Sequence, residues 1–307
     1  MIKFPPFLQP SDKVGIVAPA SKIPFSFLEH AQSLLSSWGL EVVLSNNSKK
    51  SHFDFAGKDA DRHAALQDLL DNDDIRCIFC ARGGYGTSRI IDQLDLSRFE
   101  HSPKWVIGFS DITILLNLLL NHQTASIHGP MPINFLEEKS EESLHILKQL
   151  LFTGKYPEIK FESSIRNQPG SASGKIVGGN LTMLTNSIGT KTNINTEACI
   201  LFLEDIDEKM YRIDRMLVQL KRSGMLDKIK GLIVGHFTRI GEERRFGRSV
   251  NELILSHTKD YDFPICFGAP FGHVMPNHPV VIGKNMKLRV ESAITTLSSE
   301  EDPGYQA

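Results

Sequence analysis

The chain has 307 residues, of which 41% are hydrophobic and 23% charged, a composition typical of a globular protein with a large core. Its 34 Lys and Arg nearly balance 36 Asp and Glu, and a net charge of −2 gives no electrostatic basis for binding nucleic acid or an anionic membrane. Four cysteines do not indicate a disulfide framework at this length, and Pro5, Pro6 and Pro10 interrupt any signal-peptide pattern, so we expect a cytoplasmic protein.

The first half of the chain alternates strand-like apolar runs with helical patterns. Strands are predicted at residues 13–18, 41–44, 75–81 and 105–107, and helices at 25–38, 59–70, 87–94 and 112–121. Four such rounds are typical of a doubly wound, flavodoxin-like parallel α/β sheet, which we expect to occupy residues 1–153. Ligands of such sheets bind beyond the carboxyl ends of the strands. The loops at 19–21, 82–86 and 109–111 are therefore the candidates for a site.

The second half is expected to form a smaller α/β domain. Residues 154–174 contain two prolines and three glycines with little periodicity, and we expect them to be a linker. The C-terminal domain would then span 175–307, with strands at 175–177, 199–203, 229–234 and 265–268 and helices at 181–188, 210–224 and 250–257. A hairpin around Gly283 is expected within residues 279–290.

Ser110 occupies the most informative position in the chain. The strand ending at Ile107 must turn into the next helix within about three residues, which places Ser110 at the apex of the turn, beside the N–H groups of the first helical turn. This arrangement is typical of a nucleophile elbow, G-x-S-x-G, with Gly108 and Ser110 in place and Ile112 at the position of the second glycine. The alternative is that Ser110 or Asp111 only caps the helix.

A glycine-rich loop follows the strand at 75–81. Arg82, Gly83 and Gly84 begin the sequence R-G-G-Y-G, whose glycines allow the backbone to approach a ligand and to present N–H groups to negative charge. The loop matches neither dinucleotide nor P-loop patterns. It is either a tight turn or one side of an oxyanion hole, whose other donor would be the N–H of Asp111.

A nucleophilic serine requires a base and a group that orients the base. His236 and His273 each follow a glycine at a predicted strand end in the second half, and His128 is a third possibility. Glu204 is the first polar residue after the strand at 199–203, where a carboxylate can face a cleft. Spacing alone leaves these partners undecided.

The motifs and their order along the chain indicate a family, and the family implies partners for Ser110. I-G-F-S-D-I-T, preceded by A-R-G-G-Y-G and followed by G-G-N-L, L-F-L-E-D-I-D-E and F-G-H, resembles the LD-carboxypeptidase family of bacterial serine peptidases, also called muramoyltetrapeptide carboxypeptidases. The resemblance spans nearly the whole chain. It implies Ser110 as nucleophile, Glu204 as orienting acid and His273 as base, with oxyanion donors in the loop at 82–84 and at the Asp111 N–H.

The resemblance also implies a reaction. Family members hydrolyse the bond between an L-centre, meso-diaminopimelate or lysine, and the terminal D-alanine of murein tetrapeptide during peptidoglycan recycling. They need no metal or cofactor, commonly form homodimers and act on a muropeptide in the cytoplasm. Arg82 is the residue we expect to bind the terminal carboxylate, because a guanidinium clamps a carboxylate with two hydrogen bonds.

Three alternatives come from other activities. A related group hydrolyses microcin-type acyl-adenylates with the same catalytic residues and an aromatic loop, but residues 237–246 here are polar and lack Trp. A non-catalytic muropeptide-binding protein would not need the three catalytic residue types. A flavodoxin-like nucleotide-binding protein would be expected to carry a phosphate motif.

Overall fold

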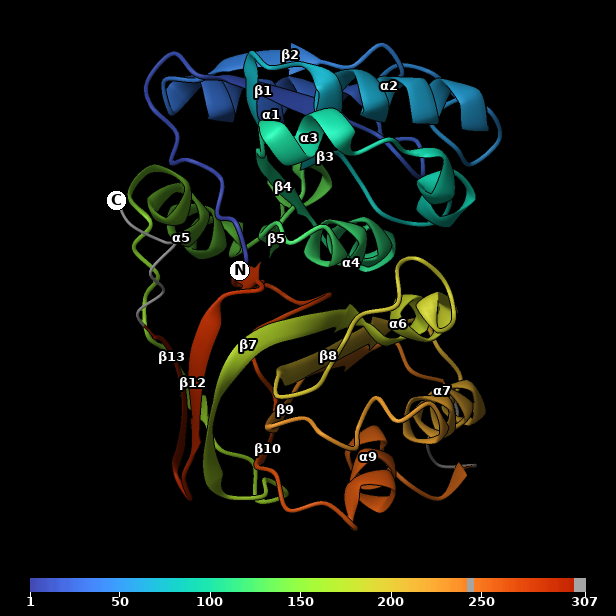
Figure 1. Ribbon diagram of the computed structural model, residues 1–307, viewed down its shortest axis with the longest axis vertical. Coiled ribbons are helices and arrows are strands. Elements are labelled where there is room, and N and C mark those ends of the chain that lie inside the picture. The colour runs from blue at the N-terminus through green and yellow to red at the C-terminus, as the bar shows by residue number, and fades with distance from the viewer. Residues whose placement is uncertain (242–245, 301–307) are drawn as a thin grey trace. The chain divides into compact units, whose positions relative to one another are not determined.

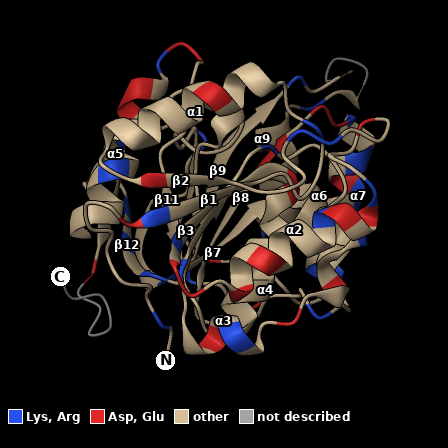
Figure 2. Ribbon diagram, turned by 90° about the horizontal axis from the view of Figure 1, so that it is seen from above, with Lys and Arg blue, Asp and Glu red and all other residues tan. Residues whose placement is uncertain are grey.

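The computed structural model describes residues 1–241 and 246–300 and divides them into two compact units (Figure 1). Unit 1 comprises Met1–Lys155 and Met275–Ile282, and unit 2 comprises Tyr156–Val274 and the described residues from Gly283 onward. Within the described residues, no helix is long and apolar enough to cross a membrane. Figure 2 shows acidic and basic residues mixed along α3 (Ser97–His101) and α7 (Met210–Arg222).

Unit 1 is built on a six-stranded sheet with the order β11-β5-β4-β3-β1-β2, in which β11 alone runs antiparallel to its neighbour. The five parallel strands have the flavodoxin-like order, which confirms the predicted fold class. The elements of unit 1 are β1 Lys13–Val17, α1 Phe25–Ser37, β2 Glu41–Leu44, α2 Asp59–Asp71, β3 Ile75–Cys80, η1 Thr87–Arg89, η2 Ile91–Gln93, α3, β4 Trp105–Gly108, η3 Ser110–Ile112, α4 Thr113–Asn121, β5 Ser126–His128, η4 Pro132–Asn134, α5 Ser140–Thr153 and β11 Val280–Ile282.

The central strands of this sheet are apolar because helices cover both of its faces, as expected for parallel sheets. Every residue of β4 is buried, as is every residue of α4 from Thr113 to Leu120. Cys77 and Cys80 on β3 are free and buried, which confirms that they are core residues. The helix expected at 87–94 is instead the two short 3-10 turns η1 and η2.

Unit 2 contains a seven-stranded sheet with the order β10-β9-β8-β7-β12-β13-β6. Its strands β7, β8, β9 and β10 are parallel to one another, and the remaining pairs are antiparallel. Helix α7 packs against both α6 and α9, and α6 also contacts β7 and β8 (Figure 1). The elements are β6 Ile159–Glu162, β7 Gly170–Asn180, α6 Leu181–Ser187, β8 Ile200–Ile206, α7, β9 Gly231–Thr238, α9 Val250–Thr258, β10 Ile265–Phe267, β12 Asn285–Val290 and β13 Ile294–Ser299.

Two expectations about the connections are wrong. Residues 154–174 are not a structureless linker, because β6 and the first half of β7 lie there and pair with β13 and β12, which come more than a hundred residues later. The hairpin around Gly283 does not form either. Strand β11 pairs with β5 in unit 1, whereas β12 belongs to the sheet of unit 2, so residues 275–282 fall outside the expected C-terminal domain. Both errors arise because strand pairing is non-local and leaves no local signal.

Gly178 on β7 lies where packing leaves no room for a side chain. Its φ is +131°, and a Cβ there would lie 2.1 Å from the carbonyl oxygen of Phe202 on β8. We expect Gly178→Ala to lower the free energy of unfolding by more than about 2 kcal/mol, because backbone strain and a clash with main chain add. Urea unfolding measures this change.

Gly189→Ala is the matched control. Gly189 also has a positive φ of +82°, but no atom lies within 4 Å of an added Cβ. Its substitution should cost only the strain, about 1 kcal/mol. Equal losses in the free energy of unfolding for the two variants would show that the clash with Phe202 adds nothing to the cost of Gly178→Ala.

Candidate functional site

Ser110 stands at the junction of β4 and α4, as predicted. The chain leaves β4 at Gly108, and Ser110 begins the short turn η3 with a left-handed backbone, φ +62°. A serine pays about 1–3 kcal/mol to hold such a conformation, which persists only where the surroundings enforce it. The strained strand–turn–helix geometry is that of a nucleophile elbow.

Gly108 explains how Ile112 can replace the second glycine of the elbow pattern. A Cβ on Gly108 would lie 2.7 Å from Cγ2 of Ile112. The side chain of Ile112 therefore folds back over Gly108. Gly108 is sufficient for the tight turn, because Ile112 occupies the space that a side chain at Gly108 would fill.

The glycine loop after β3 approaches the elbow closely. A Cβ on Gly83 would lie 3.0 Å from Ser110 Cβ and 3.3 Å from the Asp111 nitrogen. The carbonyl of Gly83 accepts a hydrogen bond from Ser21 N at 3.2 Å. Because the C=O and N–H of a trans peptide point in opposite directions, this bond also sets where the N–H of Gly84 points. The loop is more than a simple turn, since it packs against the predicted nucleophile.

Asp111 does not cap the helix. The N-cap of α4 is Ile112 and makes no side-chain hydrogen bond. The buried carboxylate of Asp111 instead accepts a hydrogen bond from Thr87 N, 2.8 Å from Oδ2. Burial raises the pKa of this carboxyl, while the hydrogen bonds from Thr87 and the backbone of Gly86 oppose the rise. Asp111 thus ties the elbow to the loop that follows β3.

Arg82 lies at a pocket of about 300 Å³ next to this loop, lined by Ser21, Lys22, Asp54, Phe55, Arg82, Gly84 and Tyr85. The guanidinium of Arg82 donates a hydrogen bond to the Lys22 carbonyl at 3.1 Å. Gly84 has a φ of +94°, and a Cβ on it would lie 2.3 Å from Ser21 Oγ. The pocket is therefore lined by two cationic side chains, those of Lys22 and Arg82, and by Gly84, where any side chain would clash with Ser21.

In unit 2, the structure brings together Glu204 and His273. Glu204 lies in the buried part of β8, and its Oε2 is 2.7 Å from Nδ1 of His273 in the loop after β10. Glu204 is fully buried, whereas the side chain of His273 retains 16% exposure. The expected contact between Glu204 and His273 is therefore confirmed.

Gly272 makes this contact possible. Its φ is +99°, and a Cβ there would lie 2.6 Å from Glu204 Oε2. A side chain at this position would therefore displace the carboxylate that holds His273. The F-G-H motif contains this glycine, but the motif by itself does not indicate that the glycine makes room for Glu204.

The electrostatics of His273 favour its protonated form. Burial by itself would lower the pKa, but the charge and hydrogen bond of Glu204, with a further contribution from Asp205, outweigh burial and raise it. Asp205 accepts hydrogen bonds from Asn180 Nδ2, Thr182 N and Thr182 Oγ1, each at 2.9 Å. Burial and then the neighbouring charge of Glu204 raise the pKa of Asp205 to about 6.

The other candidate histidines have different surroundings. His236 lies within β9, where burial lowers the pKa of its ring. Its backbone N–H donates a hydrogen bond to the Phe271 carbonyl. His128 ends β5 in unit 1, is fully buried and packs against the ring of Phe109 at 5.6 Å. Of these histidines, His273 is the one for which the structure describes an ion pair, with Glu204. Residues 242–245 of the loop at 237–246 lie outside them.

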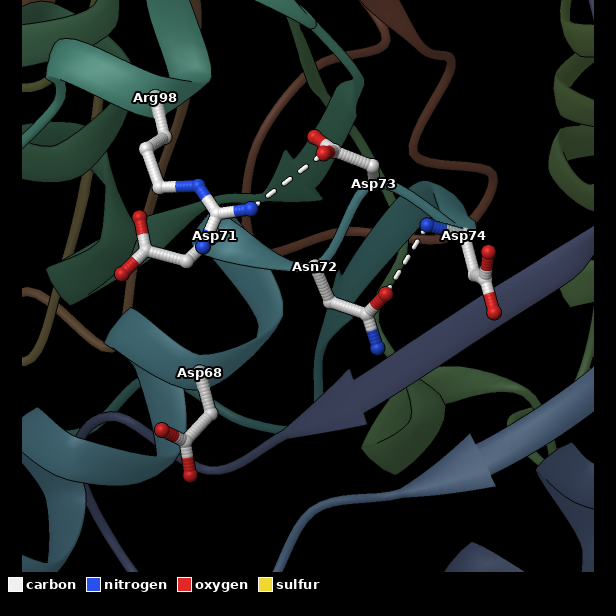
Figure 3. Close-up of a pocket in the computed structure, with 6 residues that line it drawn as sticks. All are labelled: Asp68, Asp71, Asn72, Asp73, Asp74 and Arg98. Carbon is white, nitrogen blue, oxygen red and sulfur yellow. Dashed lines mark hydrogen bonds and ion pairs between the residues drawn. The ribbon is translucent and has the colours of Figure 1, made fainter.

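A larger, acid-lined pocket of unit 1 has no part in this arrangement. Figure 3 shows Asp68, Asp71, Asp73 and Asp74 around Arg98, whose guanidinium lies 3.3 Å from Asp73. This pocket lies where α2 ends and β3 begins, at the amino ends of the strands. Ser110 follows the carboxyl end of β4, which is parallel to β3. The acid-lined pocket and Ser110 therefore lie at opposite ends of the parallel strands.

Replacing Glu204 by Gln should lower the pKa of His273, because it removes the charge that favours the imidazolium. Since the folded-state pKa of His273 is raised, the pair stabilises the fold fully below the ordinary histidine pKa of about 6.5 and loses this effect as pH rises through the raised value. Glu204→Gln should therefore destabilise the protein more at about pH 5.5 than at about pH 9. NMR titration of the His273 ring and urea unfolding at both pH values measure these effects.

Asp214→Asn provides the control, since Asp214 Oδ1 pairs with Nε2 of His257 at the same distance of 2.7 Å in the same unit. This variant should leave the titration of His273 unchanged. A His273 that titrates alike in wild type and Glu204→Gln would contradict the assigned cause of its raised pKa.

Comparisons with known proteins cover nearly all of the chain. The sequence model of the LD-carboxypeptidase N-terminal domain matches residues 14–129, and that of the LD-carboxypeptidase C-terminal domain matches residues 173–288. A protein of Bacillus subtilis named probable murein peptide carboxypeptidase is 35% identical over 98% of this chain and 96% of its own length. The murein tetrapeptide carboxypeptidase of Pseudomonas aeruginosa is 30% identical over 91% and 94%.

Solved structures agree with this relationship. The muramoyltetrapeptide carboxypeptidase of Oxalobacter formigenes has a TM-score of 0.83 and 32% identity, covering 95% of this chain and 99% of that one. The microcin C7 self-immunity protein MccF, solved with aspartyl sulfamoyl adenosine, has a TM-score of 0.86 over the full length of both chains but is only 20% identical, and so shares the fold. Matches to both domain models and to full-length relatives show that the chain belongs to the LD-carboxypeptidase family.

Proposed function

We propose that this protein is a serine-type LD-carboxypeptidase that removes the terminal D-alanine from murein tetrapeptide, cleaving the bond after diaminopimelate or lysine. Three relatives that are 30–35% identical over more than 90% of this chain are named murein peptide, murein tetrapeptide or muramoyltetrapeptide carboxypeptidase. The observation that carries the proposal is the 2.7 Å contact between Glu204 and His273, because a buried carboxylate on an imidazole is the arrangement that orients a catalytic base.

In the proposed mechanism, Ser110 Oγ attacks the scissile carbonyl carbon while Nε2 of His273 takes its proton. Glu204 holds the ring through Nδ1 and stabilises the imidazolium that forms. The tetrahedral intermediate then collapses, the C–N bond breaks, and the departing D-alanine nitrogen receives the proton from His273. Water, activated by the same histidine, next hydrolyses the acyl-enzyme and restores Ser110.

Backbone N–H groups are the proposed stabilisers of the oxyanion. The N–H of Asp111 follows the nucleophile directly, and Gly83 and Gly84 belong to the loop that packs against Ser110. Such donors act on the charge that develops in the transition state, and losing one typically costs about 10²–10³-fold in kcat. Arg82, at the adjoining pocket, is proposed to bind the terminal carboxylate of the substrate.

Ser110 belongs to unit 1, whereas Glu204 and His273 belong to unit 2. Proton transfer needs Ser110 Oγ and a ring nitrogen of His273 within about 2.6–3.2 Å, so the mechanism requires the two units to supply their groups together in the productive state. We further propose that the protein acts in the cytoplasm on recycled peptidoglycan fragments and forms a homodimer. Light scattering of the purified protein tests the dimer.

Incubation with murein tetrapeptide should release D-alanine, detected by mass. Ser110→Ala and His273→Ala should each reduce the rate by several orders of magnitude, and the double variant should be little slower than either, because the residues act as a unit. Parallel assays with diaminopimelate and lysine peptides establish the third residue, and an acyl-sulfamoyl adenosine assay tests the alternative activity.

His236→Ala is the control, since His236 has no carboxylate partner among the described residues and should be largely dispensable for rate. A dead His236→Ala variant beside an active His273→Ala would overturn the assignment of the base. Tight peptide binding without any D-alanine release would favour the non-catalytic alternative.

A further inference from the structure

A buried arginine on α2 joins the loops that surround the proposed nucleophile. Arg62 is fully buried, although its guanidinium is charged. Its Nη1 donates to the carbonyls of Pro19 at 2.6 Å and Gly86 at 2.8 Å, and its Nη2 pairs with Asp59 at the start of α2. These two carbonyls belong to the loops that follow β1 and β3. A buried cation that gives its hydrogen bonds to loop carbonyls fixes backbone, and the loops it fixes are those next to Ser110.

The peptide group between Gly86 and Thr87 is held at both ends. Its carbonyl accepts from Arg62 Nη1, and its N–H donates to Asp111 Oδ2, each at 2.8 Å. One rigid, planar peptide therefore connects the guanidinium to the residue directly after Ser110. Hydrogen bonds in series also polarise one another in a buried setting, so each bond strengthens its neighbour.

The contact at Pro19 reaches the second side of the elbow. Pro19 lies two residues before Ser21, whose N–H donates to the Gly83 carbonyl and whose Oγ accepts from Tyr85 N at 3.3 Å. Gly83 itself packs against Ser110. Arg62 is thus connected to both proposed oxyanion donors, through Thr87 to Asp111 and through Ser21 to the peptide that ends at Gly84 N.

We propose that Arg62 is a positioning residue for the oxyanion hole, acting through the Gly86–Thr87 peptide and the loop at residues 19–21. This inference rests on the proposed function in taking Ser110 as the nucleophile. Donors on two atoms are needed, because Nη1 serves both loop carbonyls and Asp59 is bound through Nη2. Lysine has the same charge but places its donors on a single atom, so it cannot reproduce that geometry.

Arg62→Lys should reduce kcat for D-alanine release by about 10- to 100-fold and leave KM within about threefold, because a displacement of about 1 Å in the hole weakens transition-state binding alone. Arg89→Lys is the matched control. The half-exposed guanidinium of Arg89 binds the same Asp59 through Nε and Nη2 and, within the described residues, donates to neither loop carbonyl. The backbone N–H of Arg89 donates to the Gly86 carbonyl at 3.1 Å, a bond that Arg89→Lys leaves in place. Its kcat should remain within about twofold of wild type.

Two further measurements separate positioning from general stability. Gly86→Ala breaks the same contact from the other side, since a Cβ there would lie 2.7 Å from Arg62 Nη1, and it should lower kcat in the same way. In a double-mutant cycle that combines Arg62→Lys with Asp111→Asn, the two effects on kcat should be far from additive, because Arg62 acts through the peptide that Asp111 holds. Rates are expressed per folded molecule, with the folded fraction taken from thermal unfolding.

A fluorophosphonate probe makes the test independent of the peptide substrate. Ser110 Oγ displaces fluoride from phosphorus, and the phosphoryl oxygen takes the place of the oxyanion, so the rate followed by mass should fall with Arg62→Lys as kcat does. Wild type that releases no D-alanine but reacts with the probe in an Arg62-dependent manner would reject the proposed substrate and keep this inference. Folded Arg62→Lys or Gly86→Ala with unchanged rates, or an equal loss in Arg89→Lys, would overturn it, and wild type inert in both assays would overturn both proposals.

Discussion

The left-handed backbone of Ser110 is the constraint on which unit 1 depends. A serine adopts a φ of +62° only when its surroundings hold it there, and three features of the structure do so. Gly108 leaves room for Ile112 to fold back, Gly83 packs directly against the serine, and Asp111 is bound to Thr87. Each is a matter of space or of backbone hydrogen bonding. The sheet places the turn, and the loops around it maintain its strain.

Unit 2 meets a different physical requirement, which is to hold a fully buried carboxylate beside a histidine. Glu204 is fully buried and would be costly there alone. His273 compensates the charge at 2.7 Å, and the glycine before it removes the side chain that would separate the pair. Asp205 adds a second acidic group whose hydrogen bonds run to Asn180 and Thr182. The surroundings of His273 are therefore more acidic than a single acid–base pair would make them.

Local patterns were sufficient where structure depends on near neighbours in the sequence. The apolar runs and helical spacing of the first half predicted the parallel sheet, and the short interval between the strand ending at Ile107 and the helix after Ile112 predicted the elbow at Ser110. They failed where pairing is remote. Nothing in residues 154–174 signals partners in β12 and β13, and nothing around Gly283 signals that β11 joins β5. Arg62 was likewise overlooked, because a single arginine within a helix has the pattern of a surface residue.

By itself, the sequence determined the fold class, the position of Ser110 at a strand end and, through the order of its motifs, the choice of Glu204 and His273. The fold class and the position of Ser110 follow from periodicity and from residue types at short spacing, which are local properties, whereas the choice of Glu204 and His273 rests on the resemblance of the motifs to a known family. Only the tertiary structure decided that Gly272 must be a glycine, that Asp111 binds Thr87 instead of capping α4, and that Arg62 clamps two loops. Such contacts join residues separated by 24 to 69 positions, and their geometry exists only once the chain has folded.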